Sequence, residues 1–233
     1  MSLSIVIPVF NEVKNIEYVL SVWNKYLNEK NISHEFVICE DGSTDGTKEL
    51  IINLQKEYPI SNQSVKERRG YGQGVISGIK ASKFDYILCI DSDGQCMPDS
   101  FLELYEDKDM ADIVIGNRNP RNDPVIRIIY SKLFKFLHDY LFKSKLKDPS
   151  CPYVLSKKIN YLKLLDKLEY LKEGFWWGFI GAAKMSGLKI LEKDIVHYKR
   201  YDGSTVVYKL NRMPMIIIKN IIGLIKLKKS YKN

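Results

Sequence analysis

Short apolar runs alternate with segments of helical periodicity through the first half of this 233-residue chain. The runs have the length and the β-branched content of buried strands. They cover residues 3–9, 35–39, 86–90 and 113–116, and the helical segments cover about 12–28, 44–58, 72–82 and 100–106. This alternation predicts an α/β fold with a mostly parallel sheet and helices on both faces. We expect Pro8 to close the first strand and Ser43 or Thr44 to cap the second helix.

The pattern changes after Pro124. Residues 125–142 predict one long apolar and basic helix, and a less regular stretch follows to about residue 202. Within that stretch we expect a helix at 176–186 and a strand at 189–195. The sequence therefore predicts one α/β domain over 1–207, which includes an interfacial helix at about 125–143, and a basic amphipathic tail over 208–233.

The positive charge is concentrated in two apolar segments. The formal net charge is +8, and residues 125–147 carry six Lys or Arg against one Asp, while residues 209–233 carry seven Lys or Arg and no acid. A nucleic-acid-binding protein would spread its basic residues over a polar face, so nucleic acid is not expected as a partner. Basic residues on amphipathic helices favour an anionic membrane surface instead. Both segments contain too few consecutive apolar residues to span a bilayer, which takes about 18 or more.

The cysteines and the first residues bear on location. The four cysteines are Cys39, Cys89, Cys96 and Cys151, and their wide spacing forms neither a zinc pattern nor a disulfide framework. This pattern is typical of a reducing compartment. The first eight residues lack a basic n-region and predict a strand rather than a secretory signal. We therefore expect a cytoplasmic protein that is peripheral on the inner face of the membrane.

Two carboxylates follow the apolar run at 86–90. Asp91 and Asp93 are one residue apart, and Gly94 lets the backbone turn directly after them. Polar residues at the carboxyl end of a strand in an open α/β sheet lie where such folds bind ligands. Mg²⁺ and Mn²⁺ favour a few carboxylates together with phosphate oxygens and water. The pair predicts a metal-bridged diphosphate, and its alternative is a solvated acidic turn.

Four ordered motifs resemble the family 2 glycosyltransferases of the GT-A fold. They are IVIPVFNE at 5–12, EDGSTDGT at 40–47, RGYGQG at 69–74 with Gly78, and DSDGQ at 91–95. The likeness covers roughly residues 3–205 and is greatest to the polyprenyl-phosphate sugar transferases, the dolichyl-phosphate mannose synthase type. It implies a Rossmann-like GT-A sheet, a nucleotide-sugar donor, and transfer of a hexose with inversion.

The resemblance also implies roles on the donor side. Asp41 would read a base edge, with a simple turn residue as its alternative, and Arg200 in RYDGST at 200–205 would reach the leaving diphosphate. The metal would be held by Asp91, Asp93 and Gln95. The residues implied to bind the donor are Pro8, Asn11, Glu12, Asp41, Gly70, Asp91, Ser92 and Gln95.

On the acceptor side, the matched positions are Arg118, Arg127 and Ser131. In the lipid-phosphate branch of the family these positions bind the acceptor phosphate, a task that suits the guanidinium fork. Arg127 and Ser131 lie one helical turn apart on the same face of the long helix. The alternative for Arg127 is a solvated or lipid-facing charge. The segment DPSCPY at 148–153 resembles a family segment near the site.

One departure from the family concerns the catalytic base. Members that glycosylate a hydroxyl carry a carboxylate on the helix near 176–186, but this chain has no Asp or Glu between Gly174 and Leu191, and Gly178 stands about where many relatives have Glu. A hydroxyl acceptor needs such a base. A phosphate monoester does not, because its second pKa of about 6 leaves it ionised at neutral pH. The missing base favours a phosphate acceptor, with Glu173 as the remaining candidate base.

The sequence therefore predicts a metal-dependent hexosyltransferase that uses a UDP- or GDP-sugar and polyprenyl phosphate. The predicted catalytic residues are Asp93, Arg118, Arg127, Ser131 and Arg200, and the predicted cofactor is Mg²⁺ or Mn²⁺. Two alternatives stay open: a soluble family 2 enzyme with a saccharide or protein hydroxyl acceptor, and a non-catalytic membrane-associated subunit. A homo-oligomer is also left open. The three histidines suggest no chemistry, and the Trp176–Trp177 pair favours packing over a sugar platform.

Overall fold

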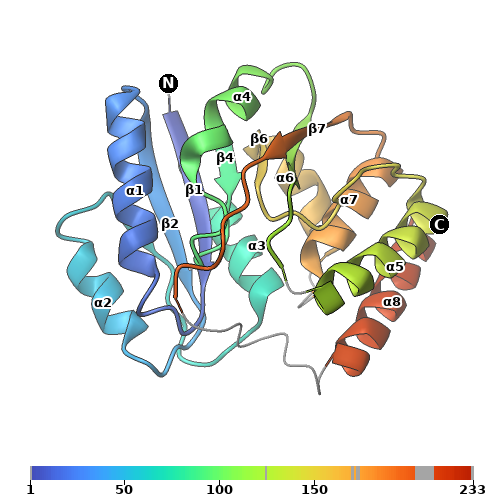
Figure 1. The fold of residues 1–233 in the computed structure, drawn as a ribbon, viewed down its shortest axis with the longest axis horizontal. Helices are drawn as coiled ribbons and strands as arrows, with labels where there is room; N and C mark the ends of the chain where they lie inside the picture. The colour runs from blue at the N-terminus through green and yellow to red at the C-terminus, as the bar shows by residue number, and fades with distance from the viewer. Residues whose placement is uncertain (1, 124, 169–170, 172–173, 203–212, 232–233) are drawn as a thin grey trace.

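A computed structural model describes residues 2–123, 125–168, 171, 174–202 and 213–231, with the backbone alone at 125–127 and 213–214. Within these residues a seven-stranded sheet has the order β3-β2-β1-β4-β6-β5-β7 (Figure 1). All neighbouring strands are parallel except β6, which runs antiparallel to both β4 and β5. The strands are β1 (Ser2–Val9), β2 (Ser33–Glu40), β3 (Ile60–Asn62), β4 (Tyr86–Cys89), β5 (Ile113–Arg118), β6 (Val154–Lys157) and β7 (Ile190–Ile195).

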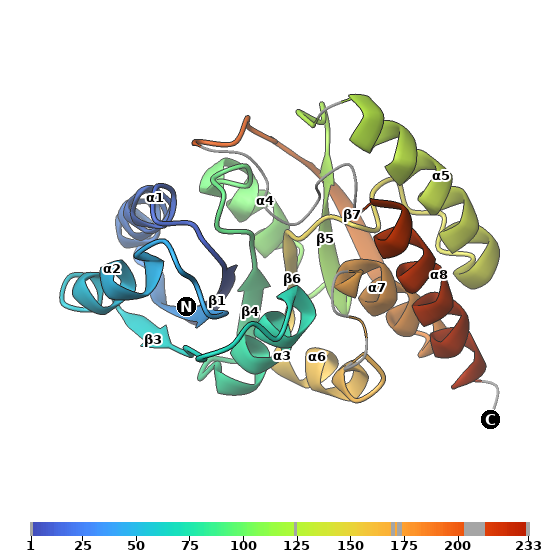
Figure 2. The ribbon, with the colours of Figure 1, turned by 90° about the horizontal axis from the view of Figure 1, so that it is seen from below.

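Helices cover both faces of the sheet, as predicted. Figure 2 shows α1 and α4 on one face and α3 and α6 on the other, while α5, α7 and α8 gather beyond β5 and β7. The helices are α1 (Ile16–Glu29), α2 (Thr47–Leu54), α3 (Tyr71–Ala81), α4 (Phe101–Glu106), α5 (Val125–Phe142), α6 (Lys158–Leu165), α7 (Phe175–Met185) and α8 (Met213–Lys229).

The central strands are buried because helices lie on both of their faces. In β1 every residue from Leu3 to Val9 is buried, and β4 and β5 are buried along nearly their whole length. Pro8 does not close β1, as expected from the sequence, but lies within it opposite Cys39 of β2. The missing N–H of Pro8 costs no ladder bond, because β4 pairs with β1 only up to Val6.

Several predicted boundaries are wrong for local reasons. The first helix begins at Ile16 rather than residue 12, because the backbone turns at Asn11 with φ 56°. The second helix begins after Gly46, in the left-handed conformation, and Ser43 instead accepts a hydrogen bond from the Asn11 N–H at 2.9 Å. Prediction also missed β3, β6 and α6.

α8 packs on the rest of the chain through one face. Leu224 and Leu227 are fully buried, and Asn220 lies against Gly174 at the start of α7. Helix α5 lies beside α8, as both ribbon views show (Figures 1 and 2). Among the described residues no helix is both long enough and apolar enough to cross a bilayer.

Candidate functional site

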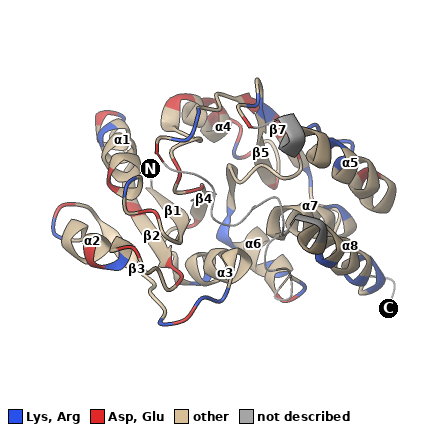
Figure 3. Cartoon of the chain, turned by 60° about the horizontal axis from the view of Figure 1, so that its bottom comes forward, with Lys and Arg blue, Asp and Glu red and all other residues tan. Residues whose placement is uncertain are grey.

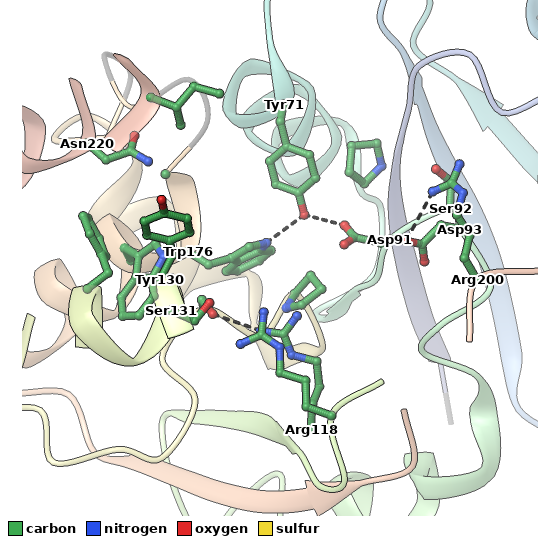
Figure 4. A pocket seen from close by; sticks show the side chains of 18 of the residues that line it. Tyr71, Asp91, Ser92, Asp93, Arg118, Tyr130, Ser131, Trp176, Arg200 and Asn220 are labelled. Carbon is green, nitrogen blue, oxygen red and sulfur yellow. Dashed lines mark hydrogen bonds and ion pairs between the residues drawn. The ribbon is translucent and has the colours of Figure 1, made fainter. Parts of the chain in front are cut away.

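A pocket of about 230 Å³ opens where β1, β4 and β5 end (Figure 4). The loops after these strands line one part of it, and α5, α7 and α8 line the other. Eight predicted site residues lie in its wall: Pro8, Glu12, Asp91, Ser92, Asp93, Arg118, Ser131 and Arg200. Ligands of open α/β sheets bind at this edge, where strand order reverses. The structure therefore brings most of the predicted site together.

The acid pair lies directly after β4. Gly94 has φ 77°, and this left-handed turn returns the chain toward the pocket. Asp93 accepts a hydrogen bond from the backbone N–H of Gln95 at 3.1 Å. Asp91 and Asp93 face one pocket with their carboxylates, the oxygen ligands that a hard divalent cation prefers. Among the described residues no group of three His, Cys, Asp or Glu side chains forms a larger metal cluster.

A hydrogen-bond chain that the sequence did not reveal fixes Asp91. The indole Nε1 of Trp176 donates to the hydroxyl of Tyr71 at 2.8 Å, and that hydroxyl donates to Asp91 Oδ1 at 2.7 Å (Figure 4). Burial, followed by the negative charge of Asp91, raises the pKa of Tyr71 well above its usual value, so the phenol stays a donor. The chain links α7, α3 and the end of β4. Tyr71 lies inside the glycine-rich motif, but nothing in that motif indicates its partner.

Arg200 joins two carboxylates from different strand ends. Its Nη2 contacts the two Glu12 oxygens at 2.6 and 2.5 Å, and its Nη1 lies 3.5 Å from Asp93 Oδ2. Burial raises the pKa of Glu12 despite the opposing effect of Arg200. The Tyr201 N–H donates to the carbonyl of Asp93 at 3.2 Å, which holds the segment after β7 over the acid pair. Arg200 thus lies beside the acids, where a diphosphate would meet it.

Arg118 ends β5 and forms a buried ion pair. Its Nε and Nη2 donate to the two oxygens of Asp148 at 2.6 and 2.9 Å, and Nη2 also donates to Ser150 Oγ at 2.9 Å. Burial lowers the pKa of Arg118, but the Asp148 carboxylate more than offsets this effect. The pKa of Arg118 is therefore raised overall. Burial likewise opposes ionisation of Asp148, yet Arg118 lowers its pKa to about 2. The segment 148–153 was expected near the site, and its role here is to hold Arg118.

The other end of the pocket is apolar. α5 contributes Tyr130 and Phe134, and α7 contributes Trp176 and Trp177. α8 adds a third wall with Ile216, Ile217 and Asn220. Ser131 of α5 also lines the pocket, and Figure 4 shows it on the same side of Asp91 as Arg118. The predicted role of Arg127 falls on a side chain outside the described residues, and so does that of Glu173.

Four predicted donor-binding residues do not line this pocket: Asn11, Asp41, Gly70 and Gln95. Asp41 is buried and accepts hydrogen bonds from the backbone N–H groups of Arg69 and Gly70, each at 2.8 Å. Asn11 Oδ1 accepts a hydrogen bond from the Thr44 N–H at 2.9 Å. These contacts shape the loops beside β1 and β2. Gln95 donates its side-chain amide to the Tyr198 carbonyl at 3.1 Å.

α7 carries no carboxylate, as the sequence shows, and the packing explains why Gly178 has no larger side chain. A Cβ built on Gly178 would lie 2.0 Å from Leu171 Cδ1. A glutamate there would have to displace the buried Leu171 side chain. Within the described residues, the acids that line the pocket are Glu12, Asp91 and Asp93. Glu12 is bound to Arg200, and α7 supplies no acid that could act as a base.

Comparison of the sequence with family models identifies one match. The model for "Glycosyl transferase family 2" matches residues 4–171. The dolichyl-phosphate beta-glucosyltransferase of Dictyostelium discoideum is 27% identical over 222 residues, which cover 87% of this chain and 68% of that protein. The dolichol-phosphate mannosyltransferase of Pyrococcus furiosus is 31% identical over 138 residues, 57% of this chain and 39% of that protein. The chain thus matches less than half of the second relative's length.

Solved structures share the fold. The glucosyl-3-phosphoglycerate synthase from Mycobacterium tuberculosis, solved with Mn²⁺, UDP and glucosyl-3-phosphoglycerate, superposes with a TM-score of 0.75. The sequences are 19% identical, and the match covers 98% of this chain and 80% of that chain. At this identity the likeness concerns the fold, and it confirms the predicted GT-A architecture.

Proposed function

Because the chain belongs to glycosyl transferase family 2, we propose that it transfers a hexose from a UDP- or GDP-sugar to polyprenyl phosphate. The relatives named for dolichyl-phosphate and dolichol-phosphate transfer support this acceptor class. Transfer would take place with inversion, by a protein bound to the cytoplasmic face of the membrane. The observation that carries the proposal is one pocket with carboxylates at one end, arginines between, and apolar helices at the other end.

The carboxylate end suits the donor. Asp91 and Asp93 fit Mg²⁺ or Mn²⁺, which would screen the charge that develops on the leaving diphosphate. The M. tuberculosis synthase, solved with Mn²⁺ and UDP, supports a cation in this fold. Arg200 is held next to Asp93 and Glu12, so its guanidinium can meet the diphosphate without a large movement. Tyr71 and Trp176 hold the Asp91 carboxylate in one orientation.

The arginine region suits an anionic acceptor. A phosphate monoester is already ionised at neutral pH and attacks the anomeric carbon without a base. Arg118 has a fixed position because Asp148 and Ser150 hold it, and a fixed guanidinium orients a phosphate at little entropic cost. The absence of acids from α7 agrees with such a nucleophile.

The apolar end suits a lipid at a membrane surface. Outside the pocket α5 exposes large apolar side chains: Ile129, Leu133, Phe136 and Tyr140. α8 exposes another set beside it: Met215, Ile218, Ile222 and Ile225. Lys residues accompany both sets, coloured blue in Figure 3. An apolar face with basic residues favours the surface of an anionic bilayer, where each Lys contributes about 1 kcal/mol.

The test is transfer itself. Purified protein is given radiolabelled UDP-glucose or GDP-mannose with Mn²⁺ and polyprenyl phosphate in detergent. We expect a lipid product that releases its sugar in mild acid, as a glycosyl phosphate does. Asp93→Asn should lower the rate by roughly 10²-fold or more, and EDTA should abolish it. Transfer to a hydroxyl, with an acid-stable product, or full activity in EDTA would contradict the proposal.

A further inference from the structure

Arg121 is a pocket residue that the sequence motifs did not single out. It lies three positions after Arg118 in the loop between β5 and α5, and it lines the same pocket. Its side chain is only 16% exposed. Nε of Arg121 donates to Asp123 at 2.5 Å, the partner that neutralises part of its charge.

The two guanidinium groups share one region of the pocket. Both arginines line the pocket, and the pKa of Arg121 is lowered first by burial and then by the nearby positive charge of Arg118. Each has its own carboxylate, Asp148 for Arg118 and Asp123 for Arg121. Both carboxylates approach from outside the pocket wall, since neither lines the pocket.

Donor nitrogens remain on both arginines. In the described part of the chain, Arg118 uses Nε and Nη2, and Arg121 uses Nε alone. The Nη1 atom of Arg118 and both Nη atoms of Arg121 have no protein acceptor there. Among the described residues these nitrogens are not fully buried, and both arginines line the pocket, so a ligand in the pocket can reach them. An anion with several oxygens would satisfy these donors.

We propose that Arg121, together with Arg118, binds the phosphate group of the acceptor. The inference rests on the proposed function and adds a residue to its acceptor site. Phosphate oxygens occur in both substrates, but the surroundings distinguish them. Figure 4 shows Arg118 on the same side of Asp91 as Ser131 and Trp176, whereas Arg200 lies next to Asp93 on the other side. Arg121 therefore belongs to the side that leads to the apolar helices.

The experiment compares Arg121→Gln and Arg121→Lys with wild type, and uses farnesyl phosphate as the acceptor probe. Binding is measured by calorimetry without donor, and KM and kcat are measured for transfer. Loss of a charged hydrogen bond predicts roughly 10-fold to 100-fold weaker binding of farnesyl phosphate by Arg121→Gln. Arg121→Lys should fall between, because it keeps the charge and loses the fork. The control is Lys193→Gln, a cation paired with Asp107 that does not line the pocket.

Two measurements, farnesyl phosphate binding and nucleotide binding, distinguish the acceptor phosphate from the donor diphosphate. The Kd for UDP or GDP with Mn²⁺ should stay within about twofold of the wild-type value in both Arg121 variants. A twofold change in Kd corresponds to about 0.4 kcal/mol of binding free energy. Unchanged farnesyl phosphate binding in Arg121→Gln, or a loss of nucleotide affinity instead, overturns the inference alone. No binding or transfer to farnesyl phosphate by wild type overturns the proposed function with it. Circular dichroism shows whether Arg121→Gln is folded, and if it is not, Arg121→Lys decides by the same criteria.

Discussion

The ion pair between Arg118 and Asp148 should be the most sensitive electrostatic contact of the site. The Asp148→Asn substitution keeps the shape of the side chain but leaves Arg118 buried without its counter-charge. The side chains are only 7% and 8% exposed, so water cannot replace the lost partner. Removal of one partner from a buried pair costs about 3–5 kcal/mol.

The pKa of Asp148 gives a second measure of the same contact. Burial opposes ionisation, but Arg118 lowers the pKa from 3.8 to about 2. That difference corresponds to about 2 kcal/mol of stabilisation of the folded state. Together the two measures predict a loss of about 2–5 kcal/mol for Asp148→Asn, which in a domain of this size lowers Tm by about 4 to 20 °C.

The direction of the pH dependence follows from the lowered pKa. Between about pH 4 and pH 2 the unfolded chain binds a proton at Asp148 that the folded chain does not. The stabilisation is therefore complete above about pH 4 and is lost as the pH falls towards 2. Asp148→Asn should remove this part of the acid dependence.

Urea unfolding followed by circular dichroism measures both effects. Lys14→Gln is the matched control, because its pair with Asp202 is 68% and 47% exposed and should contribute at most about 1 kcal/mol. Asp148→Leu combined with Arg118→Met should recover much of the loss, since no charge stays unpaired. A stability of Asp148→Asn within about 0.5 kcal/mol of wild type, or an unchanged acid slope, would refute the reasoning.

Two further predictions concern the Tyr71 hydroxyl and the outer face of α8. Tyr71→Phe removes the hydroxyl that bridges the indole of α7 and the first aspartate of the pair, and it should lower kcat roughly tenfold and raise the Mn²⁺ concentration needed for UDP binding. Tyr86→Phe is its control, because the Tyr86 hydroxyl also contacts an aspartate, but on the exposed surface. If both variants lower kcat equally, the Tyr71 hydroxyl has no special role in the site. Ile218→Gln with Ile222→Gln should weaken sedimentation with anionic vesicles at unchanged Tm, whereas Leu224→Ala should cost about 2–5 kcal/mol of stability. Unchanged sedimentation of the double variant would exclude this face of α8 as the membrane contact.

Long periodic segments were the most predictable part of the fold. The helix expected at 125–142 has these bounds, because its apolar pattern runs without interruption to residue 142. β6 was missed because it has only four residues and directly precedes α6, so neither period repeats long enough to be recognised. Its antiparallel direction could not be predicted either, since it depends on pairing with β4 and β5, whose sequence positions lie well upstream.

The site also has features that could be predicted from the sequence and features that could not. The place of Asp91 and Asp93 at the end of β4 was predictable because they directly follow a strand that the sequence indicates. The contact from Trp176 to Tyr71 joins residues 105 positions apart, and no local pattern indicates it. Asp148 appeared in a motif, but its pairing with Arg118 depends on the packing of β6 between β4 and β5.

The place of α8 changes how membrane attachment can be tested. Successive residues of a helix differ by about 100° in direction, so one turn can serve two surfaces. Ile217 lines the pocket, while its neighbour Ile218 is 57% exposed on the outer face. Removal of the tail would therefore delete a pocket wall and the outer apolar face together, and a loss of activity would not show which of them mattered. Substitutions on the outer face alone separate the two, because they leave Ile217 and the buried Leu224 in place.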